Sequence, residues 1–512
     1  MQNHYFKTVL FLLLFSFNAH AQLNPIPCNT PSNSQELDIN NVRAKFWASG
    51  SMWFDPVTGR PNYEIPKGED HHSLFAFDLW MGAIDEFEQK RLDWQAYAGE
   101  FVANAYFPGP LNNSGYTDLS TCEHYDRVWK INKSAIDSFR LGLLVEIPKD
   151  ILEWPAKGNP HISFSPQKDL APFVDLNKDQ IYSPLEGDYP DILGDQALWW
   201  VFNDNGHGEY LGFLPLQMEV QVMAYAYNSS PKLQNHTFYK YTFTNRGYGR
   251  LDDIMLGLHI DADLGQFDDD YVGCDTLRNL AIAYNGDMQD GDYGEDIPIA
   301  GIKLLQGPQK SDDTYSDMYT FWYRGSDFTH WGRPSHKQAA CYGLWGLSQN
   351  GTMMTYGGHG TGQGTTPTLF MYPSDPTDED GWSECSENNP PADRTMFMGV
   401  GPFSIEPNQQ KELHFAALWV RDNIEHTCPS FAPIQEAADY VQDLFDNGLI
   451  TNIEENPTSI VSKSNVHLFP NPATANTILT LQQEQTLQEG TFQLFDSLGR
   501  LVKSVDLKAL HQ

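Results

Sequence analysis

From Leu37 onward, short β-rich segments alternate with Gly, Pro, Asn and Asp at close intervals. Turn-forming residues at this spacing interrupt helices, and many short strands separated by turn signals are typical of all-β sandwich proteins. We therefore predict a mainly β protein, made of β-sandwich domains with few helices and a small C-terminal β-sandwich module. The 512 residues are enough for roughly two to four domains.

Two strand pairs are predicted most clearly. The first joins 218–227 to 237–244 through a turn-rich connection, and the second joins 402–405 to 412–420 through Glu406-Pro407-Asn408. Alternation with a period of two places one set of side chains on a single face of each strand. The residues expected on these faces are Met218, Val220, Val222, Ala224 and Ala226, then Tyr239, Tyr241 and Phe243, and finally Leu413, Phe415, Ala417 and Trp419.

One helix is predicted near the end of the body. It begins around Pro433, ends at Asn447-Gly448, and carries apolar residues at helical spacing. The residues expected on its buried side are Ala437, Val441, Leu444 and Phe445. The polar stretch that follows is interpreted as a linker. The predicted organisation is a β-rich region over 22–210, a β-sandwich region over 211–450, a linker over 451–465 and a C-terminal module over 466–512.

The first residues are typical of a signal peptide. Lys7 precedes the apolar stretch 9–17, and Ala19-His20-Ala21 provides the small residues that signal peptidase needs. We therefore expect residues 1–21 to be removed and the protein to be exported through the periplasm. No later segment reaches the roughly 20 apolar residues of a membrane span, so we expect no transmembrane segment.

Charge and cysteine content limit the partners and the disulfides that the chain can have. Acidic residues outnumber basic ones 67 to 32, giving a formal charge of -35, which repels nucleic acid and makes cations the natural partners. Six widely spaced cysteines allow up to three disulfides in an oxidising compartment, with 15 pairings open. They are Cys28, Cys122, Cys274, Cys341, Cys385 and Cys428.

Segment 175–186 has the spacing of a calcium-binding loop. Oxygen-bearing side chains stand at positions 1, 3, 5, 9 and 12, as in EF-hand-like loops. Gln180 replaces the turn glycine and Pro184 interrupts the helix that would follow, so an isolated extracellular calcium loop is predicted. The alternative is an Asx-turn loop without an ion. The predicted ligands are Asp175, Asn177, Asp179, the carbonyl of Ile181, and Glu186, with Asp188 as the alternative closing ligand.

A second acidic cluster follows the apolar strand 254–260. Asp261 and Asp263 point the same way if the strand continues, and their charges repel unless a cation or a proton lies between them. Asp269 and Asp270 follow shortly after. These four residues are the candidates for a second Ca²⁺ site, and a solvated acidic loop is the alternative.

The tail contains two motifs, Phe469-Pro470-Asn471-Pro472 and Leu494-Phe495-Asp496-Ser497-Leu498-Gly499-Arg500-Leu501-Val502. They closely resemble the C-terminal sorting domain of type IX secretion cargo in Bacteroidetes-type bacteria. The match covers 466–512, and because family members continue into a further strand pair, we expect a partial domain. The resemblance implies the type IX secretion machinery as a partner and a secreted or outer-membrane-surface location. Segments 37–44, 79–82, 107–111 and 261–275 resemble an uncharacterised group of such cargo proteins.

Two functions remain open from the sequence. The first is a calcium-binding β-sandwich protein with a binding, adhesion or structural role, with surface glycans or proteins as candidate partners. The alternative is an extracellular hydrolase of polysaccharide or peptide, although neither H-E-x-x-H nor G-x-S-x-G occurs. Exposed aromatic platforms would favour binding, whereas core packing is the alternative use of tryptophans. The tryptophans concerned are Trp47, Trp53, Trp80, Trp199 and Trp200.

Overall fold

The computed structural model describes most of the chain from Cys28 to Ile450 and the backbone of four strands beyond it. The parts described are 28–95, 97, 106–164, 166–206, 213–325, 330–332, 334, 336–361, 364–421, 428–450, 465–469, 478–482, 491–495 and 501–506. The predicted signal peptide and nearly all of the predicted linker lie outside these residues. The chain divides into two compact units, Met1–Asn452 and Ile453–Gln512.

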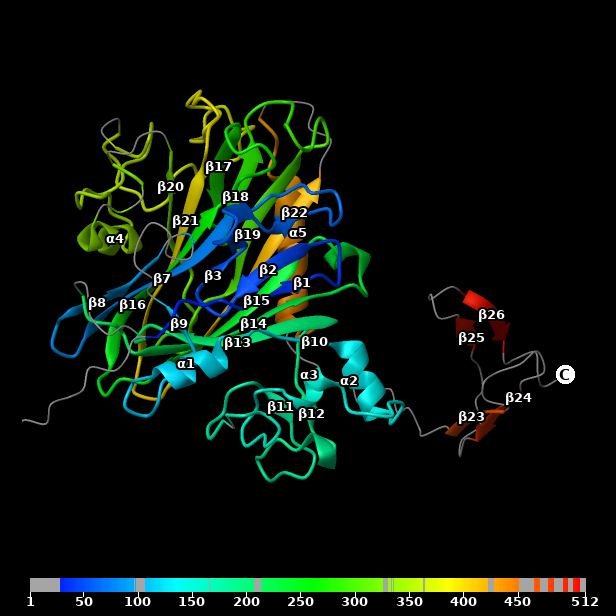
Figure 1. Ribbon diagram of the computed structural model, residues 1–512. Coiled ribbons are helices and arrows are strands. Elements are labelled where there is room, and N and C mark those ends of the chain that lie inside the picture. Colours follow the sequence, from blue (N-terminus) through cyan, green and yellow to red (C-terminus); the bar gives the residue numbers. More distant parts are fainter. Residues whose placement is uncertain are drawn as a thin grey trace, which may run out of the picture. The chain divides into compact units, whose positions relative to one another are not determined.

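The first unit is mainly β and contains two large antiparallel sheets (Figure 1). In order across the first sheet lie β1 (Ser34–Leu37), β2 (Arg43–Trp47), β3 (Ser51–Met52), β7 (Ala76–Asp85), β16 (Leu251–Asp261), β21 (Thr395–Ile405) and β20 (Met318–Arg324), with β6 (Tyr63–Glu64) beside β2 and β8 (Lys90–Asp93) beside β7. The second sheet runs β10 (Trp129–Asn132), β13 (Gln196–Asn203), β14 (Met218–Ala226), β15 (Thr237–Asn245), β22 (Gln410–Arg421), β19 (Pro298–Gln306), β18 (Leu280–Asn285) and β17 (Asp270–Asp275), with β9 (Phe107–Pro108) beside β13. Two small pairs are β4 (Phe54–Asp55) with β5 (Arg60–Pro61) and β11 (Phe173–Val174) with β12 (Tyr189–Pro190).

The two large sheets pack face to face. Phe77 of the first sheet stacks on Phe415 of the second, with ring centroids 5.5 Å apart, and Phe46 lies 5.6 Å from Trp200. All the side chains predicted on the inner faces of β14, β15 and β22 are buried in this shared core. The five tryptophans singled out from the sequence are buried as well, so they pack in the core and form no exposed platform.

The helices are few and short. Within the described residues they are α1 (Leu119–Tyr125), α2 (Lys133–Arg140), α3 (Lys149–Leu152), α4 (Lys337–Leu344) and α5 (Ala432–Asp446), and 3₁₀ turns include Pro184–Glu186 and Pro231–Leu233. The predicted helix is α5, which packs on β22 and β19 on the outer face of the second sheet (Figure 1). Its buried residues are Ile434, Ala438, Val441 and Phe445. Ala437 and Leu444 were predicted to be buried but are only half-buried. The helix is rotated so that Ile434 and Ala438 lie at the centre of its buried side, which places Ala437 and Leu444 at the edge.

One predicted hairpin is confirmed and the other is wrong. β14 and β15 pair in antiparallel register, with Val222 opposite Tyr241. β21 and β22 do not pair, since β21 lies between β16 and β20, and β22 lies between β15 and β19. The chain therefore crosses from one sheet to the other at 406–409. Both strands turn an apolar face to the same core, so their alternation does not reveal that they belong to different sheets.

The predicted boundary near residue 210 falls between two paired strands. β13 pairs with β14 across it, and β7 pairs with β16, so residues from both sides contribute to both sheets. Two disulfides, Cys28–Cys122 and Cys385–Cys428, are formed, and the thiols of Cys274 and Cys341 are buried and free. Among the residues described, no helix combines the length and apolar character needed to cross a membrane.

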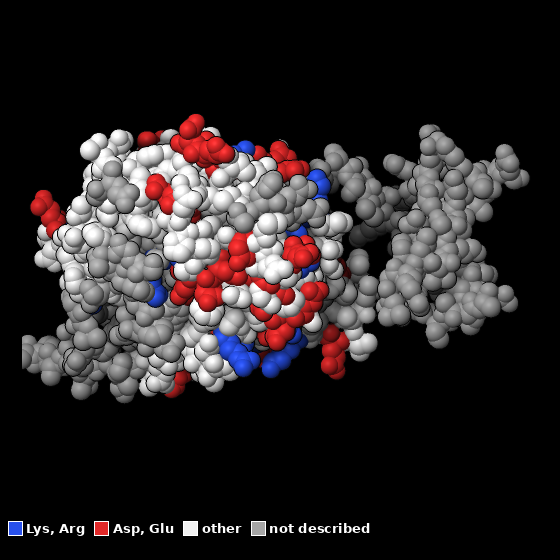
Figure 2. Space-filling view, turned by 90° about the horizontal axis from the view of Figure 1, so that it is seen from above, with Lys and Arg blue, Asp and Glu red and all other residues white. Residues whose placement is uncertain are grey.

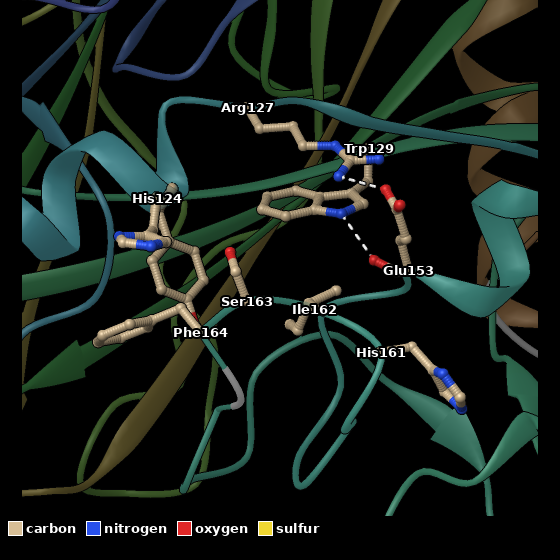
Figure 3. Close-up of a pocket in the computed structure, with 9 residues that line it drawn as sticks. His124, Arg127, Trp129, Glu153, His161, Ile162, Ser163 and Phe164 are labelled. Atoms are coloured by element: carbon tan, nitrogen blue, oxygen red, sulfur yellow. Dashed lines mark hydrogen bonds and ion pairs between the residues drawn. The ribbon is translucent and has the colours of Figure 1, made fainter.

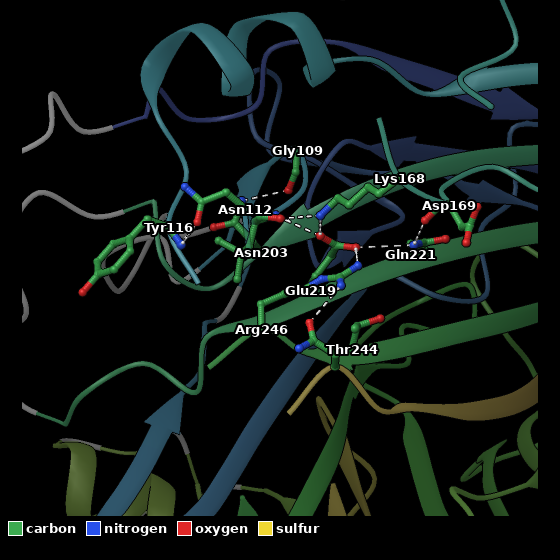
Figure 4. A network of polar contacts seen from close by, with 12 residues as sticks. Gly109, Asn112, Tyr116, Lys168, Asp169, Asn203, Glu219, Gln221, Thr244 and Arg246 are labelled. Carbon is green, nitrogen blue, oxygen red and sulfur yellow. Dashed lines mark hydrogen bonds and ion pairs between the residues drawn. The ribbon is translucent and has the colours of Figure 1, made fainter. Parts of the chain in front are cut away.

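A buried ion-pair network ties strands of the second sheet to neighbouring loops (Figure 4). The Glu219 side chain is fully buried and accepts hydrogen bonds from the Lys168 ammonium and from the Arg246 guanidinium, the latter at 2.9 Å. The backbone N–H of Leu111 donates to the same carboxylate at 2.9 Å. The charge of Glu219 is thus compensated by two cations within the fold.

The second unit consists, in its described part, of two antiparallel strand pairs. β23 (Asn465–Phe469) pairs with β24 (Ile478–Gln482), and β25 (Thr491–Phe495) pairs with β26 (Leu501–Asp506). The strands predicted on either side of Asp496-Ser497-Leu498-Gly499 are therefore confirmed. The turn itself and Pro470-Asn471-Pro472 lie outside the described residues.

Candidate cation site

Three carboxylates meet where β16 ends. One oxygen each from Asp261, Asp263 and Asp393 lies within 4.8 Å of the other two. Asp261 is buried, Asp263 is half-buried and Asp393 is exposed, so the group is open to solvent on one side. Even at the full 4.8 Å, a point shared by the three oxygens lies about 2.8 Å from each, so small side-chain shifts would bring all three to the roughly 2.3–2.6 Å of Ca²⁺–oxygen bonds.

Strand pairing creates this meeting. Asp261 is the last residue of β16 and lies opposite Thr395, the first residue of β21. The segments that continue from these two positions therefore carry Asp263 and Asp393 at the same end of the sheet. The Asp261 carboxylate is held by the Tyr97 hydroxyl at 2.8 Å and the Thr395 hydroxyl at 3.0 Å.

The electrostatics of the group favour a bound cation. Burial, reinforced by the nearby charge of Asp393, raises the pKa of Asp261 to about 6. Burial and the charges of Asp261 and Asp393 also raise the pKa of Asp263 well above its ordinary value. Without a cation these carboxyl groups hold their protons up to a higher pH than an isolated aspartate does, because closely spaced negative charges in a poorly solvated place repel one another. A divalent cation would replace those protons.

The acidic character extends to the start of β17. Burial raises the pKa of Asp270 well above its ordinary value. Burial and the charge of Asp290 together raise the pKa of Asp269 to about 7. One oxygen of Asp270 accepts the N–H of Leu264 at 3.0 Å, and its other oxygen has no hydrogen-bond partner among the described residues. Figure 2 looks onto this end of the unit and shows acidic side chains gathered over the middle of the face.

The loop predicted over 175–186 connects β11 to β12 and is closed by its own side chains. Asp175 accepts the N–H groups of Lys178 at 2.6 Å and Gln180 at 2.8 Å, and Asp179 accepts that of Ile181 at 2.8 Å. Gln180, at the position of the usual turn glycine, adopts a positive φ of 63°. The backbone therefore makes the turn that a glycine makes in EF-hand loops.

The two proposed closing ligands of this loop differ in their surroundings. The Glu186 carboxylate accepts the side-chain amide of Asn177 at 2.7 Å, so loop positions 3 and 12 meet. Asp188 is fully buried, and its two oxygens accept the N–H groups of Leu176 and Ser183, both at 2.9 Å. Asp188 therefore anchors the backbone of the loop, and Glu186 is the better placed closing ligand.

Asp393 is the site residue that sequence reasoning missed. It lies more than a hundred residues from Asp261, and no local spacing connects the two. Only the register of β16 with β21 brings them together, so a correct pairing of these strands is the signal that would have found it.

No known protein-family model matches this chain, and no curated protein matches it either. The functional argument therefore rests on the residues themselves.

Proposed function

We propose that the protein is secreted or held at the cell surface, that Ca²⁺ stabilises it, and that it has a binding or structural role. The observation that carries the calcium proposal is the meeting of Asp261, Asp263 and Asp393 in a place that raises the pKa of the first two. Such carboxylates gain most from a cation, because binding removes their mutual repulsion.

The donor set favours calcium over other common metals. The ligand atoms are all carboxylate oxygens, whereas zinc and copper sites use histidine or cysteine. Ca²⁺ accepts six to eight oxygens in flexible geometry, and water can complete the shell on the exposed side of Asp393. Mg²⁺ demands a stricter octahedron.

The secretion proposal rests on other features. The residues of 1–21 are those of a signal peptide, and the tail motifs resemble a type IX sorting domain. Two disulfides fit an oxidising compartment, since disulfides persist mainly outside the cytoplasm.

The hydrolase alternative finds one supporting observation, the raised pKa of Asp261, which resembles that of a general acid. Glycosidase carboxyl groups, however, stand about 5 Å or more apart around the scissile bond. Oxygens of Asp261 and Asp263 lie closer than that, and the Asp261 carboxylate is buried. This geometry favours a cation over a sugar between the two carboxylates.

Calcium titration of the mature chain by isothermal calorimetry tests the proposal, with Mg²⁺ as the comparison ion. We expect Asp263→Asn and Asp179→Asn each to remove one Ca²⁺ from the binding stoichiometry. The exposed Asp380→Asn, which makes the same chemical change outside both sites, should bind as the wild type does. An unchanged stoichiometry in Asp263→Asn would refute the assignment of the main site.

A further inference from the structure

A pocket with a volume of about 370 Å³ opens beside α1 and is built from elements that the cation site does not use (Figure 3). α1 supplies His124 and Tyr125, β10 supplies Trp129, and the loop 161–164 forms the facing wall. Volumes of about 300–1,000 Å³ are typical of small-molecule sites. The pocket is therefore large enough for a ring-sized ligand.

The walls of this pocket are held in place by the fold. Asn159 is fully buried, and its side-chain amide donates to the carbonyls of Leu152 at 2.9 Å and Trp154 at 2.7 Å. Its side-chain oxygen accepts the N–H of His161 at 2.9 Å, which fixes the start of the facing wall. A ligand would find this part of the pocket already formed, so binding would lose little entropy in ordering it.

Aromatic rings form part of the wall of this otherwise polar pocket. Phe164 keeps 39% of its surface exposed, and its ring centroid lies 4.9 Å from that of His124 and 6.0 Å from that of Tyr125. The Trp129 ring lies 5.1 Å from the Arg127 guanidinium. Tyr125 and Trp129 are themselves buried, so Phe164 is the ring that offers a ligand a flat, rigid contact area.

The polar groups of the pocket carry matched charges. The Arg127 guanidinium donates to the Glu153 carboxylate at 2.8 Å, and the indole N–H of Trp129 donates to the Glu153 carbonyl at 2.9 Å. Lys149 lies 3.7 Å from the other Glu153 oxygen, and Asp150 is close enough to interact with these charges, so two cations and two carboxylates balance here. Ser163 and His161 add groups that can both donate and accept.

This combination indicates the chemical class of the ligand. A phosphate or carboxylate would meet the negative charge of Glu153, and an ammonium would meet the positive charge of Arg127. Neighbouring hydroxyl groups can accept from the guanidinium and donate to the carboxylate at the same time, while a ring packs on Phe164. We propose that this pocket binds a neutral saccharide ring. The proposal is independent of calcium binding at the acidic end.

The test uses the mature chain on an array of neutral and acidic glycans, followed by calorimetric titration of the glycans that bind. We expect binding to a neutral glycan that survives a calcium chelator. Phe164→Ala and Glu153→Gln should each weaken it about tenfold or more, because truncation of a central contact residue commonly has such an effect. Phe87→Ala, an exposed phenylalanine that lines a different cleft, should leave the affinity unchanged.

Three results would overturn the proposal. They are no glycan bound by the folded chain, binding restricted to acidic glycans, and binding that Phe164→Ala and Glu153→Gln leave intact. Circular dichroism of each variant shows whether it is folded. Because the expected binding persists in chelator, failure of the calcium proposal leaves this result unaffected.

Discussion

Replacing Asp261 by asparagine should stabilise the calcium-free protein at neutral pH. Burial and Asp393 raise the pKa of Asp261 from 3.8 to about 6, so the folded state holds a proton that the unfolded state has already released. Below pH 3.8 both states are protonated, and as pH rises through about 6 this contribution to stability is lost. The difference corresponds to about 3 kcal/mol of lost stability at neutral pH.

Asparagine carries no charge and avoids this loss. It provides one side-chain oxygen where the carboxylate accepts from both Tyr97 and Thr395, and the weaker hydrogen bonding costs about 1 kcal/mol. In chelator at neutral pH, the free energy of unfolding of Asp261→Asn should therefore be about 2 kcal/mol higher than that of the wild type. Below about pH 4 that advantage should vanish, because Asp261 of the wild type is then protonated in both states.

In calcium, the wild type should become more stable than Asp261→Asn. At a hundredfold excess over its dissociation constant, a ligand that binds only the folded state stabilises it by about 2.7 kcal/mol. The wild type should gain this from the acidic site, whereas Asp261→Asn should gain only what calcium at the loop 175–186 contributes. Urea unfolding followed by tryptophan fluorescence, in chelator and in calcium, measures all four free energies. A variant that is less stable than the wild type in chelator at neutral pH, or that gains equally from calcium, would refute the reasoning.

Three further predictions concern other parts of the chain. Glu219→Ala should lower the free energy of unfolding by about 3–5 kcal/mol, because Lys168 and Arg246 lose their buried partner; urea unfolding measures it. Cys428→Ser should lower it by about 4 kcal/mol, since the disulfide with Cys385 spans a sequence separation of 43; guanidinium unfolding measures it. Deletion of 466–512 should leave the protein in the periplasm of the producing bacterium, as cell fractionation would show.

Each of these has its own control. The exposed Glu379→Ala should change stability little, and a similar small loss in Glu219→Ala would contradict the role of the buried network. Cys341→Ser removes a thiol outside any disulfide and should cost less than Cys428→Ser. Surface delivery of the chain without 466–512 would exclude the tail as the sorting signal.

The fold class was predictable because alternation and turn residues are local signals. In β14, Val220 and Val222 face the core between the sheets, as their spacing predicts. Sheet membership was not predictable in the same way. Phe403 of β21 and Leu413 of β22 belong to different sheets but are buried in the same core. Both strands alternate with the same period of two, so the alternation cannot tell which sheet each strand joins.

The candidate site was predictable only in part. Asp261 and Asp263 follow an apolar strand at a spacing of two, which indicates repelling charges on one side. Asp393 required the pairing of β16 with β21. The saccharide pocket had no sequence signal, because Trp129 and Phe164 become its walls only after α1, β10 and the loop 161–164 are assembled.

The crossing of the chain between sheets has a consequence for the rate of folding. β7 must find β16, and β15 must find β22, before either sheet is complete, and each pair joins segments more than a hundred residues apart. Chains dominated by such distant pairings fold slowly, and domains of this size commonly pass through intermediates. For the export proposed above, slow pairing is an advantage, because a chain whose strands have not yet paired can still be threaded through a membrane channel.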